Sequence, residues 1–97
     1  SPQTLPRNVA LAIGDNAARQ AAAQRVWAAG FQLPVIIHPL TSIGANTVLG
    51  DGTLMCAGAL LDPYVSIGKG SILNAGSAVG HDTRTEDFVH ICGGTYV

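Results

Sequence analysis

The stretch "IHPLTSIGANTVLGDGTLMCAGALLDPYVSIGKGSILNAGSAVG", residues 37–80, repeats one pattern every six residues without an insertion. A large aliphatic residue opens each hexad, and a small or β-branched residue follows four places later. The opening positions are Ile37, Ile43, Leu49, Met55, Leu61, Ile67, Leu73 and Val79, and the period continues through Thr85 and Ile91 to Val97. Glycine, proline and small polar residues fill the places between, which is typical of a chain that turns after every short strand.

This period excludes an α-helix, because a repeat of six drifts around a turn of 3.6 residues and leaves no apolar stripe. Short strands separated by turns accommodate it, since each coil of such a chain pairs with the next at a spacing of about 4.8 Å. We therefore predict a parallel β-helix over residues 35–97. Thr85 is the one opening residue that is not a large aliphatic, so we expect the repeat to be weakest there.

A different pattern precedes the hexads. Residues 9–13, "VALAI", predict a buried strand, and "GDN" at 14–16 predicts a turn in which Asp15 or Asn16 caps a helix. Residues 17–30 are rich in alanine and end at Gly30, which suits a left-handed C-terminal cap. We interpret residues 1–34 as the C-terminal part of a small α/β domain. Because the chain opens at Ser1 and reaches this strand within about eight residues, we expect it to be a fragment.

Composition excludes several function classes. A net charge of −1 and a pI near 6.2 leave no basic surface for nucleic acid or an anionic membrane. Although 47% of the residues are apolar, no run approaches the roughly 20 that cross a bilayer. No basic segment followed by an apolar one stands at the N-terminus. We therefore expect a cytoplasmic protein that binds neither nucleic acid nor membrane.

The hexads resemble those of the hexapeptide-repeat acyltransferases, which form a left-handed parallel β-helix with three hexads in each triangular coil. The handedness is implied by this resemblance alone. With three hexads a coil, residues 18 apart stack, so His38, Cys56, Asn74 and Cys92 form one column. Cys56 and Cys92 then lie two rungs apart, about 9.6 Å, which is too far for a disulfide. We predict that both cysteines are reduced thiols and serve only as small packing residues in this column.

Residues 78–91, "AVGHDTRTEDFVHI", concentrate charge at the weak hexad. His81 falls at a corner and His90 on an outer face. Polar groups that break a repeat indicate a functional site, although ordinary surface histidines are the alternative. Zinc bound by His38, His81 and His90 is a chemical rival, but His38 lies more than two coils from His81, and zinc needs nitrogens within about 2.1 Å. We predict no metal within one subunit, while a site shared between subunits stays open.

The order of the Gly-Asp-Asn turn, the helix, "IHP", the hexads, "ILNAGSAVGHD" and "DFVHI" resembles one branch more closely. It is that of the nucleotide-linked amino-sugar N-acetyltransferases (bacillosamine and perosamine pathways) and the related sialic acid O-acetyltransferases, which join a nucleotide-binding α/β domain to the β-helix. The resemblance implies that residues 1–34 belong to a nucleotide-sugar-binding domain. It covers nearly the whole chain from about residue 8.

The resemblance also implies roles for individual residues. His81 corresponds to the general base, and Asp82 to the acidic residue that supports it, where the branch often carries glutamate. Residues matching Asn74 and His90 line the acetyl-CoA and acceptor site. Gly14, Asp15 and Asn16 would contact the nucleotide, because helix N-termini favour phosphate, with a simple helix cap as the other reading of Asp15 and Asn16. A histidine that titrates near neutral pH suits the removal of a proton from an attacking amine.

The resemblance, whose family packs three prisms as a trimer, implies a homotrimeric acetyltransferase that moves an acetyl group from acetyl-CoA to the amino group of a nucleotide-linked amino sugar. In the resembled family the active site lies between neighbouring subunits, and the outward apolar residues Leu54 and Ile72 favour a covered face. Because the family's first strand, its "GGHA"-like loop and its last coils have no counterpart in these 97 residues, we expect the chain alone to be inactive. Acetylation of a sialic acid hydroxyl and a non-catalytic β-helix assembly module remain alternatives.

Overall fold

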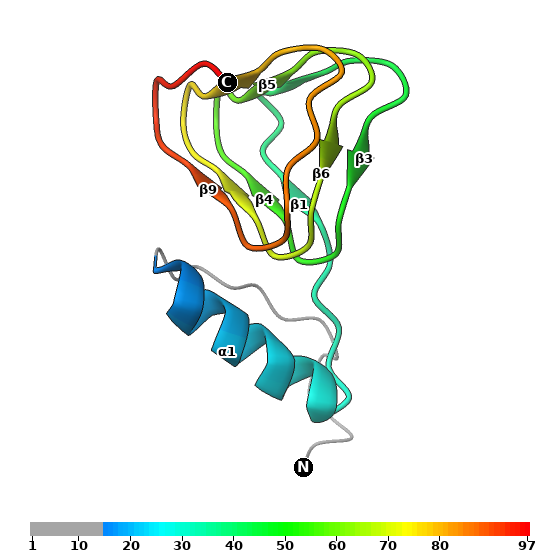
Figure 1. The fold of residues 1–97 in the computed structure, drawn as a ribbon, viewed down its shortest axis with the longest axis vertical. Coiled ribbons are helices and arrows are strands. Elements are labelled where there is room, and N and C mark those ends of the chain that lie inside the picture. The colour runs from blue at the N-terminus through cyan, green and yellow to red at the C-terminus, as the bar shows by residue number, and fades with distance from the viewer. Residues whose placement is uncertain (1–14) are drawn as a thin grey trace.

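The computed structural model describes residues 15–97, which form one helix and then nine two-residue strands (Figure 1). The strand expected at residues 9–13 lies outside this range. The helix is α1 (Asn16–Ala28). The strands are β1 (Ile36–Ile37), β2 (Ser42–Ile43), β3 (Val48–Leu49), β4 (Leu54–Met55), β5 (Leu60–Leu61), β6 (Ser66–Ile67), β7 (Ile72–Leu73), β8 (Ala78–Val79) and β9 (His90–Ile91).

Both ends of α1 are closed by the residues that the sequence indicated. Asp15 has an extended backbone, and its side chain accepts a hydrogen bond from the Ala18 amide at 2.8 Å. At the other end Gly30 has a φ of 84°, and the Gly30 and Phe31 amides donate to the carbonyl oxygens of Trp27 and Val26. This is a Schellman cap, which uses a left-handed residue after the helix.

The strands stack as three parallel sheets around a triangular core. Their orders are β1-β4-β7-β9, β2-β5-β8 and β3-β6, and every pair has a register of 18 residues, as in Leu54 opposite Ile72. The expected three hexads per coil are therefore confirmed. The hexad opened by Thr85 forms no strand within residues 15–97 and contributes only an isolated bridge between Ser66 and Arg84.

The interior of the coil is made by the second residue of each strand. The buried members are Met55, Leu61, Ile67, Leu73, Val79 and Ile91, together with Ala59 and Val65. Full burial of one such side chain contributes about 1.5–3 kcal/mol. At the first coil the same positions are open, since Ile37 and Ile43 are 42% and 40% exposed. The core therefore begins one coil after the repeat does.

Each of the three corners carries a column of residues with left-handed backbone. One column is Gly52, Gly70 and Phe88, the second is Gly58, Gly76 and Gly94, and the third is Asn46, Tyr64 and Asp82. We call the third corner the histidine ridge, because His81 precedes Asp82 on it. A left-handed residue with a side chain costs roughly 1–2 kcal/mol relative to glycine, so the histidine ridge is the strained corner.

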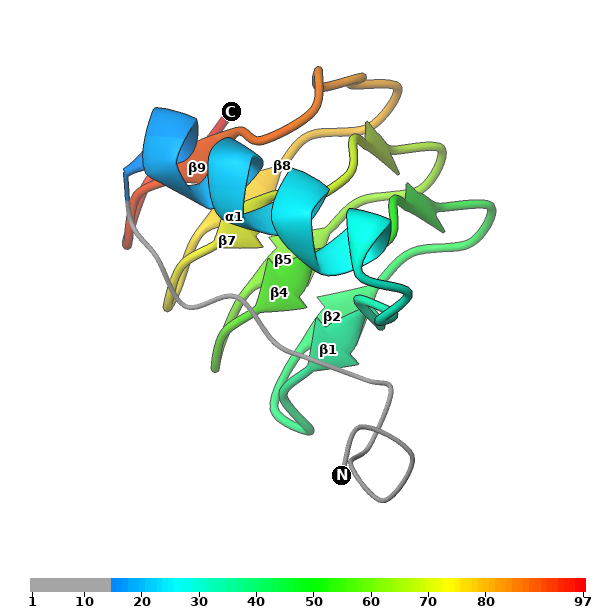
Figure 2. The same ribbon diagram turned by 90° about the horizontal axis from the view of Figure 1, so that it is seen from below.

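The helix packs along the corner of Gly52, Gly70 and Phe88, across the stacked coils (Figure 2). Arg19 is fully buried there, and its Nε donates to the Gly70 carbonyl oxygen at 2.6 Å. The rings of Trp27 and Phe88 lie 6.3 Å apart, and Ala23 and Leu33 are buried beside them. A single apolar cluster thus joins the helix to the β-helix. Within residues 15–97 no helix is both long and apolar enough to cross a membrane.

Candidate functional site

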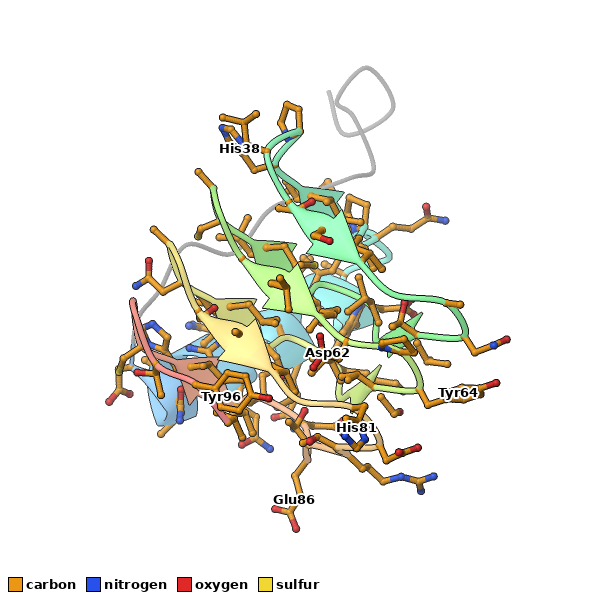
Figure 3. The ribbon with its side chains drawn as sticks, turned by 90° about the horizontal axis from the view of Figure 1, so that it is seen from above. His38, Asp62, Tyr64, His81, Glu86 and Tyr96 are labelled. Atoms are coloured by element: carbon orange, nitrogen blue, oxygen red, sulfur yellow. The ribbon has the colours of Figure 1, made fainter. Side chains whose placement is uncertain are left out.

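His81 and Asp82 form a side-chain pair at the histidine ridge. Nδ1 of His81 lies 2.9 Å from Oδ2 of Asp82, and both side chains are largely exposed. Figure 3 shows the position of His81. A carboxylate accepts hydrogen bonds and cannot donate one when ionised, so the proton of the neutral imidazole resides on Nδ1. Nε2 then carries a lone pair that faces away from Asp82 and is available to accept a proton.

The surroundings of His81 favour its protonated form. The hydrogen bond that His81 donates to Asp82 raises the pKa of His81 above its usual value, and the charge of Asp82 adds to this effect. Slight desolvation opposes the shift, and the carboxylate of Asp62 raises the pKa further. Asp62 lies one coil from Gly80, because its amide donates to the Val79 carbonyl oxygen at 3.0 Å. Two carboxylates therefore act on this histidine.

Asn74 and His90 form a second pair. The Asn74 Oδ1 atom accepts a hydrogen bond from the Ala75 amide at 2.7 Å, which orients the amide group so that Nδ2 faces Nε2 of His90 at 3.3 Å. Nδ2 can only donate. Nε2 of His90 is therefore the acceptor, and neutral His90 carries its proton on Nδ1.

The two pairs lie at different corners of the prism. Asn74 directly follows β7, whereas His81 lies two residues after the end of β8 of the next sheet. One side of the triangle separates them, so a single chain does not bring the four predicted residues into one site. The structure unites His81 with Asp82 and Asn74 with His90, and it does not unite the pairs.

Part of the charged stretch after His81 has a structural role. Oγ1 of Thr85 accepts from the Gly68 amide at 3.2 Å, and Oδ1 of Asp87 accepts from the Lys69 amide at 2.8 Å. Oγ1 of Thr85 takes the place of a backbone carbonyl oxygen, since the Gly50 amide one coil away donates to the Ile67 carbonyl oxygen. Glu86 is exposed and points outward (Figure 3). These hydrogen bonds explain in part why polar and charged residues are concentrated at residues 82–87.

The residues predicted to contact a nucleotide have structural partners. Asp15 caps α1, and Oδ1 of Asn16 accepts a hydrogen bond from Nη2 of Arg19 at 2.8 Å. Burial lowers the pKa of Arg19, and the charge of Asp15 partly opposes that shift. Gly14 lies outside the described residues. The nucleotide contact stays a prediction.

The histidines and cysteines are dispersed along the prism. His38 belongs to the first coil, far from His81 (Figure 3), and its Nδ1 accepts from the Leu40 amide at 3.0 Å. Among residues 15–97 no three histidine, cysteine or acidic side chains are grouped so as to hold a metal ion. Cys56 and Cys92 are both free thiols, in agreement with the prediction from their spacing.

The outer column on the sheet of β4 and β7 differs from expectation in one respect. Leu54, Ile72 and His90 stack as predicted. However, Ile72 is only 6% exposed in the single chain, so it needs no second subunit to cover it. The argument for a covered face rests instead on Leu54, which is half-buried, and on Ile36, which is 38% exposed.

Two residues near His81 were not predicted as site residues. Asp62 replaces the glycine found at the equivalent positions one coil away, Gly44 and Gly80. The Tyr96 hydroxyl lies over Gly80, 3.0 Å from where a Cβ of that residue would be. In the sequence, the aspartate at a position that is glycine one coil before and one coil after could have identified Asp62 as a site residue.

A cavity of about 290 Å³ lies elsewhere, between Trp27, Leu33 and Asp51. It includes none of the predicted site residues.

Solved structures resemble the chain closely. The acetyltransferase domain of PglB from Neisseria gonorrhoeae FA1090 matches with a TM-score of 0.91 and 30% identity over 98% of this chain. The same domain in complex with acetyl coenzyme A matches with a TM-score of 0.91 and 30% identity over 97% of the chain. The chain spans about half the length of these domains, 48% and 47%. No family model matches the sequence.

A more distant neighbour has the same fold. PerB from Caulobacter crescentus, solved with CoA and GDP-perosamine, matches with a TM-score of 0.53 and 20% identity over 98% of this chain and 66% of its own. The structural neighbours are therefore hexapeptide-type acetyltransferases of the branch that the sequence resembles. That resemblance and the left-handed β-helix predicted from it are confirmed.

Proposed function

We propose that the chain forms part of an acetyltransferase that moves an acetyl group from acetyl-CoA to the amino group of a nucleotide-linked amino sugar. The similarity to the PglB acetyltransferase domain with acetyl coenzyme A supports the reaction class and the donor. The perosamine enzyme, which shares the fold, was solved with a nucleotide-linked amino sugar. The observation that carries the proposal is the His81–Asp82 pair, which leaves Nε2 of His81 as a base.

The reaction needs one proton to be moved. The amine nitrogen attacks the thioester carbonyl carbon, and Nε2 of His81 takes the proton that the nitrogen loses. When the tetrahedral intermediate collapses, the C–S bond breaks and the same proton passes to the leaving thiolate, giving an amide and CoA. Asp82 stabilises the imidazolium that forms in between and fixes the tautomer. Neither Cys56 nor Cys92 is required as a covalent carrier.

The charges around His81 favour an amine over a sialic acid hydroxyl as acceptor. An amino sugar approaches as an ammonium ion or a neutral amine, and the carboxylates of Asp62 and Asp82 attract the cationic form. A sialic acid hydroxyl has no cationic form, so this local attraction is absent for sugar O-acetylation. Sugar O-acetylation is the weaker candidate on that ground.

We further propose that the active protein is a homotrimer in which His81 of one copy meets Asn74 and His90 of a neighbour. The separation of the two pairs by one side of the prism supports this arrangement, because a site that includes both requires a second copy. Asp15 and Asn16 would approach the nucleotide. We also propose that the protein acts in the cytoplasm, where acetyl-CoA and nucleotide sugars are available.

The test is acetyl transfer by the protein at its full natural length. The acceptors are UDP- and GDP-linked 4-amino sugars and sialic acid, each with acetyl-CoA, and CoA release is followed with a thiol reagent. We expect transfer to an amino sugar and none to sialic acid. Transfer to sialic acid alone would replace the proposal with O-acetylation. Absence of any transfer and of acetyl-CoA binding would favour the non-catalytic assembly module.

A further inference from the structure

Tyr64 occupies a backbone conformation that its side chain disfavours. Its φ is 62°, in the left-handed region, where an aromatic residue is an outlier. The two corners away from the histidine ridge use glycine at five of their six left-handed positions, namely Gly52, Gly58, Gly70, Gly76 and Gly94. A glycine at 64 would serve the turn equally well, so the fold itself does not require the tyrosine.

Packing within the chain does not offset this strain. The one aromatic at a glycine-rich corner, Phe88, is half-buried, lies over Gly70 and contacts Trp27. Tyr64 is 61% exposed. Within residues 15–97 its hydroxyl makes no hydrogen bond, and its backbone amide donates to Ala45 as any residue there would. Backbone strain that no packing contact offsets is concentrated at binding sites in proteins.

The position of Tyr64 connects it to the proposed base. It lies on the histidine ridge one coil from Asp82, whose amide donates to the carbonyl oxygen of Pro63 at 3.3 Å. The tyrosine ring extends outward from the ridge in the coil next to that of His81 (Figure 3). One coil corresponds to about 4.8 Å, so both side chains border the same region of solvent.

We propose that Tyr64 binds the acceptor, with its ring stacked on the sugar ring that carries the reacting amino group. This inference rests on the proposed function. The amino group at Nε2 of His81 is bonded directly to the sugar ring, which therefore lies within about one coil spacing of the base. On the donor side the atoms next to the reacting carbonyl belong to the flexible pantetheine arm, which has no ring to stack. An aromatic face favours apolar faces of rings.

The test compares Tyr64→Gly and Tyr64→Phe in the protein at full natural length, with Asn46→Gly as the control on the same ridge. We expect Tyr64→Gly to raise the KM for the amino sugar about three- to tenfold, which is the value of one aromatic contact, while the KM for acetyl-CoA is unchanged. Tyr64→Phe keeps the wild-type KM. Asn46→Gly also keeps it, although it too replaces a left-handed residue of the histidine ridge with glycine.

Thermal unfolding separates binding from a structural role. Because glycine relieves the strain, Tyr64→Gly should melt at the same temperature as wild type or higher while binding the acceptor more weakly. An unchanged acceptor KM in Tyr64→Gly, with His81-dependent transfer intact in wild type, would overturn this inference alone. A KM increase confined to acetyl-CoA would also overturn it. Failure of wild type to bind any amino sugar by saturation-transfer NMR would overturn it together with the proposed function.

Discussion

Nε of Arg19, on α1, donates a hydrogen bond to the carbonyl oxygen of Gly70 at 2.6 Å, although 51 residues separate them in sequence. Arg19 is fully buried, and Asn16 holds the other end of its guanidinium. The helix is thereby attached to the β-helix by a charged hydrogen bond as well as by apolar contacts. Such bonds are stronger than neutral ones.

Replacement of Arg19 by methionine should destabilise the protein. The substitution keeps an apolar stem but leaves the Gly70 carbonyl oxygen without its donor, which costs about 1–3 kcal/mol. Urea unfolding followed by Trp27 fluorescence measures the loss. Arg25→Met, at an exposed position of the same helix, is the matched control and should change stability little. Equal effects of the two substitutions would contradict the role of Arg19.

Two glycines with the same backbone should respond differently to alanine. Gly70 and Gly94 have φ values of 63° and 71°, so both substitutions strain the chain. A Cβ at Gly70 would also collide with the Phe88 ring, whereas one at Gly94 would meet no atom within 4 Å. We expect Gly94→Ala to cost about 1–2 kcal/mol and Gly70→Ala to cost about 1–3 kcal/mol more from overpacking. Thermal denaturation of both variants checks the order, and equal losses would show that the Phe88 contact is absent.

Removal of the Asp82 charge should shift the pH dependence of acetyl transfer. Asp82 raises the pKa of His81, and only neutral His81 accepts a proton, so wild-type kcat/KM falls as pH drops through that raised pKa. In Asp82→Asn the pKa of His81 decreases, and the acidic limb of the profile should move to lower pH while the plateau rate falls. An acidic limb that stays in place would show that another group controls it.

The tautomer of His90 is a prediction that needs no substrate. Because the Ala75 amide orients Asn74, Nδ2 of Asn74 donates to Nε2 of His90, and the neutral ring carries its proton on Nδ1. Nitrogen-15 NMR of the neutral imidazole should show a protonated Nδ1. Asn74→Ala should produce a mixture of tautomers, because the donor is lost. A protonated Nε2 in the wild type would contradict the geometry.

The period of six was predictable from the sequence because the repeat has no insertion between Ile37 and Val79. The register of 18 residues needed in addition the family resemblance, which implied three hexads in each coil. The helix caps at Asp15 and Gly30 were predictable for the same local reason, since each depends on a few adjacent residues. The weak hexad at Thr85 was correctly located by its polar residue.

Other features depend on packing that the pattern does not contain. The burial of Arg19 depends on where α1 meets the corner at Gly70, and Ile72 is buried although it lies on the outer face. Asn74, His81 and His90 are close in sequence, but one side of the prism separates His81 from the other two within a single chain. Thr85 and Asp87 belong to the charged stretch in sequence, whereas their side chains accept hydrogen bonds from backbone amides of the preceding coil. The sheet to which a strand belongs determines where the residues after its end lie. Their separation in sequence therefore does not show how far apart they are in space.

The central claim is that Nε2 of His81 is the base for acetyl transfer. The most direct measurement is kcat/KM for acetyl transfer from acetyl-CoA to a UDP- or GDP-linked 4-amino sugar by wild type and His81→Ala, both at full natural length. Because His81 is exposed, the variant should fold normally, which circular dichroism would verify. The account predicts a decrease of about 10²–10⁴-fold in the variant. Activity within a few-fold of wild type would contradict it and remove His81 from the mechanism.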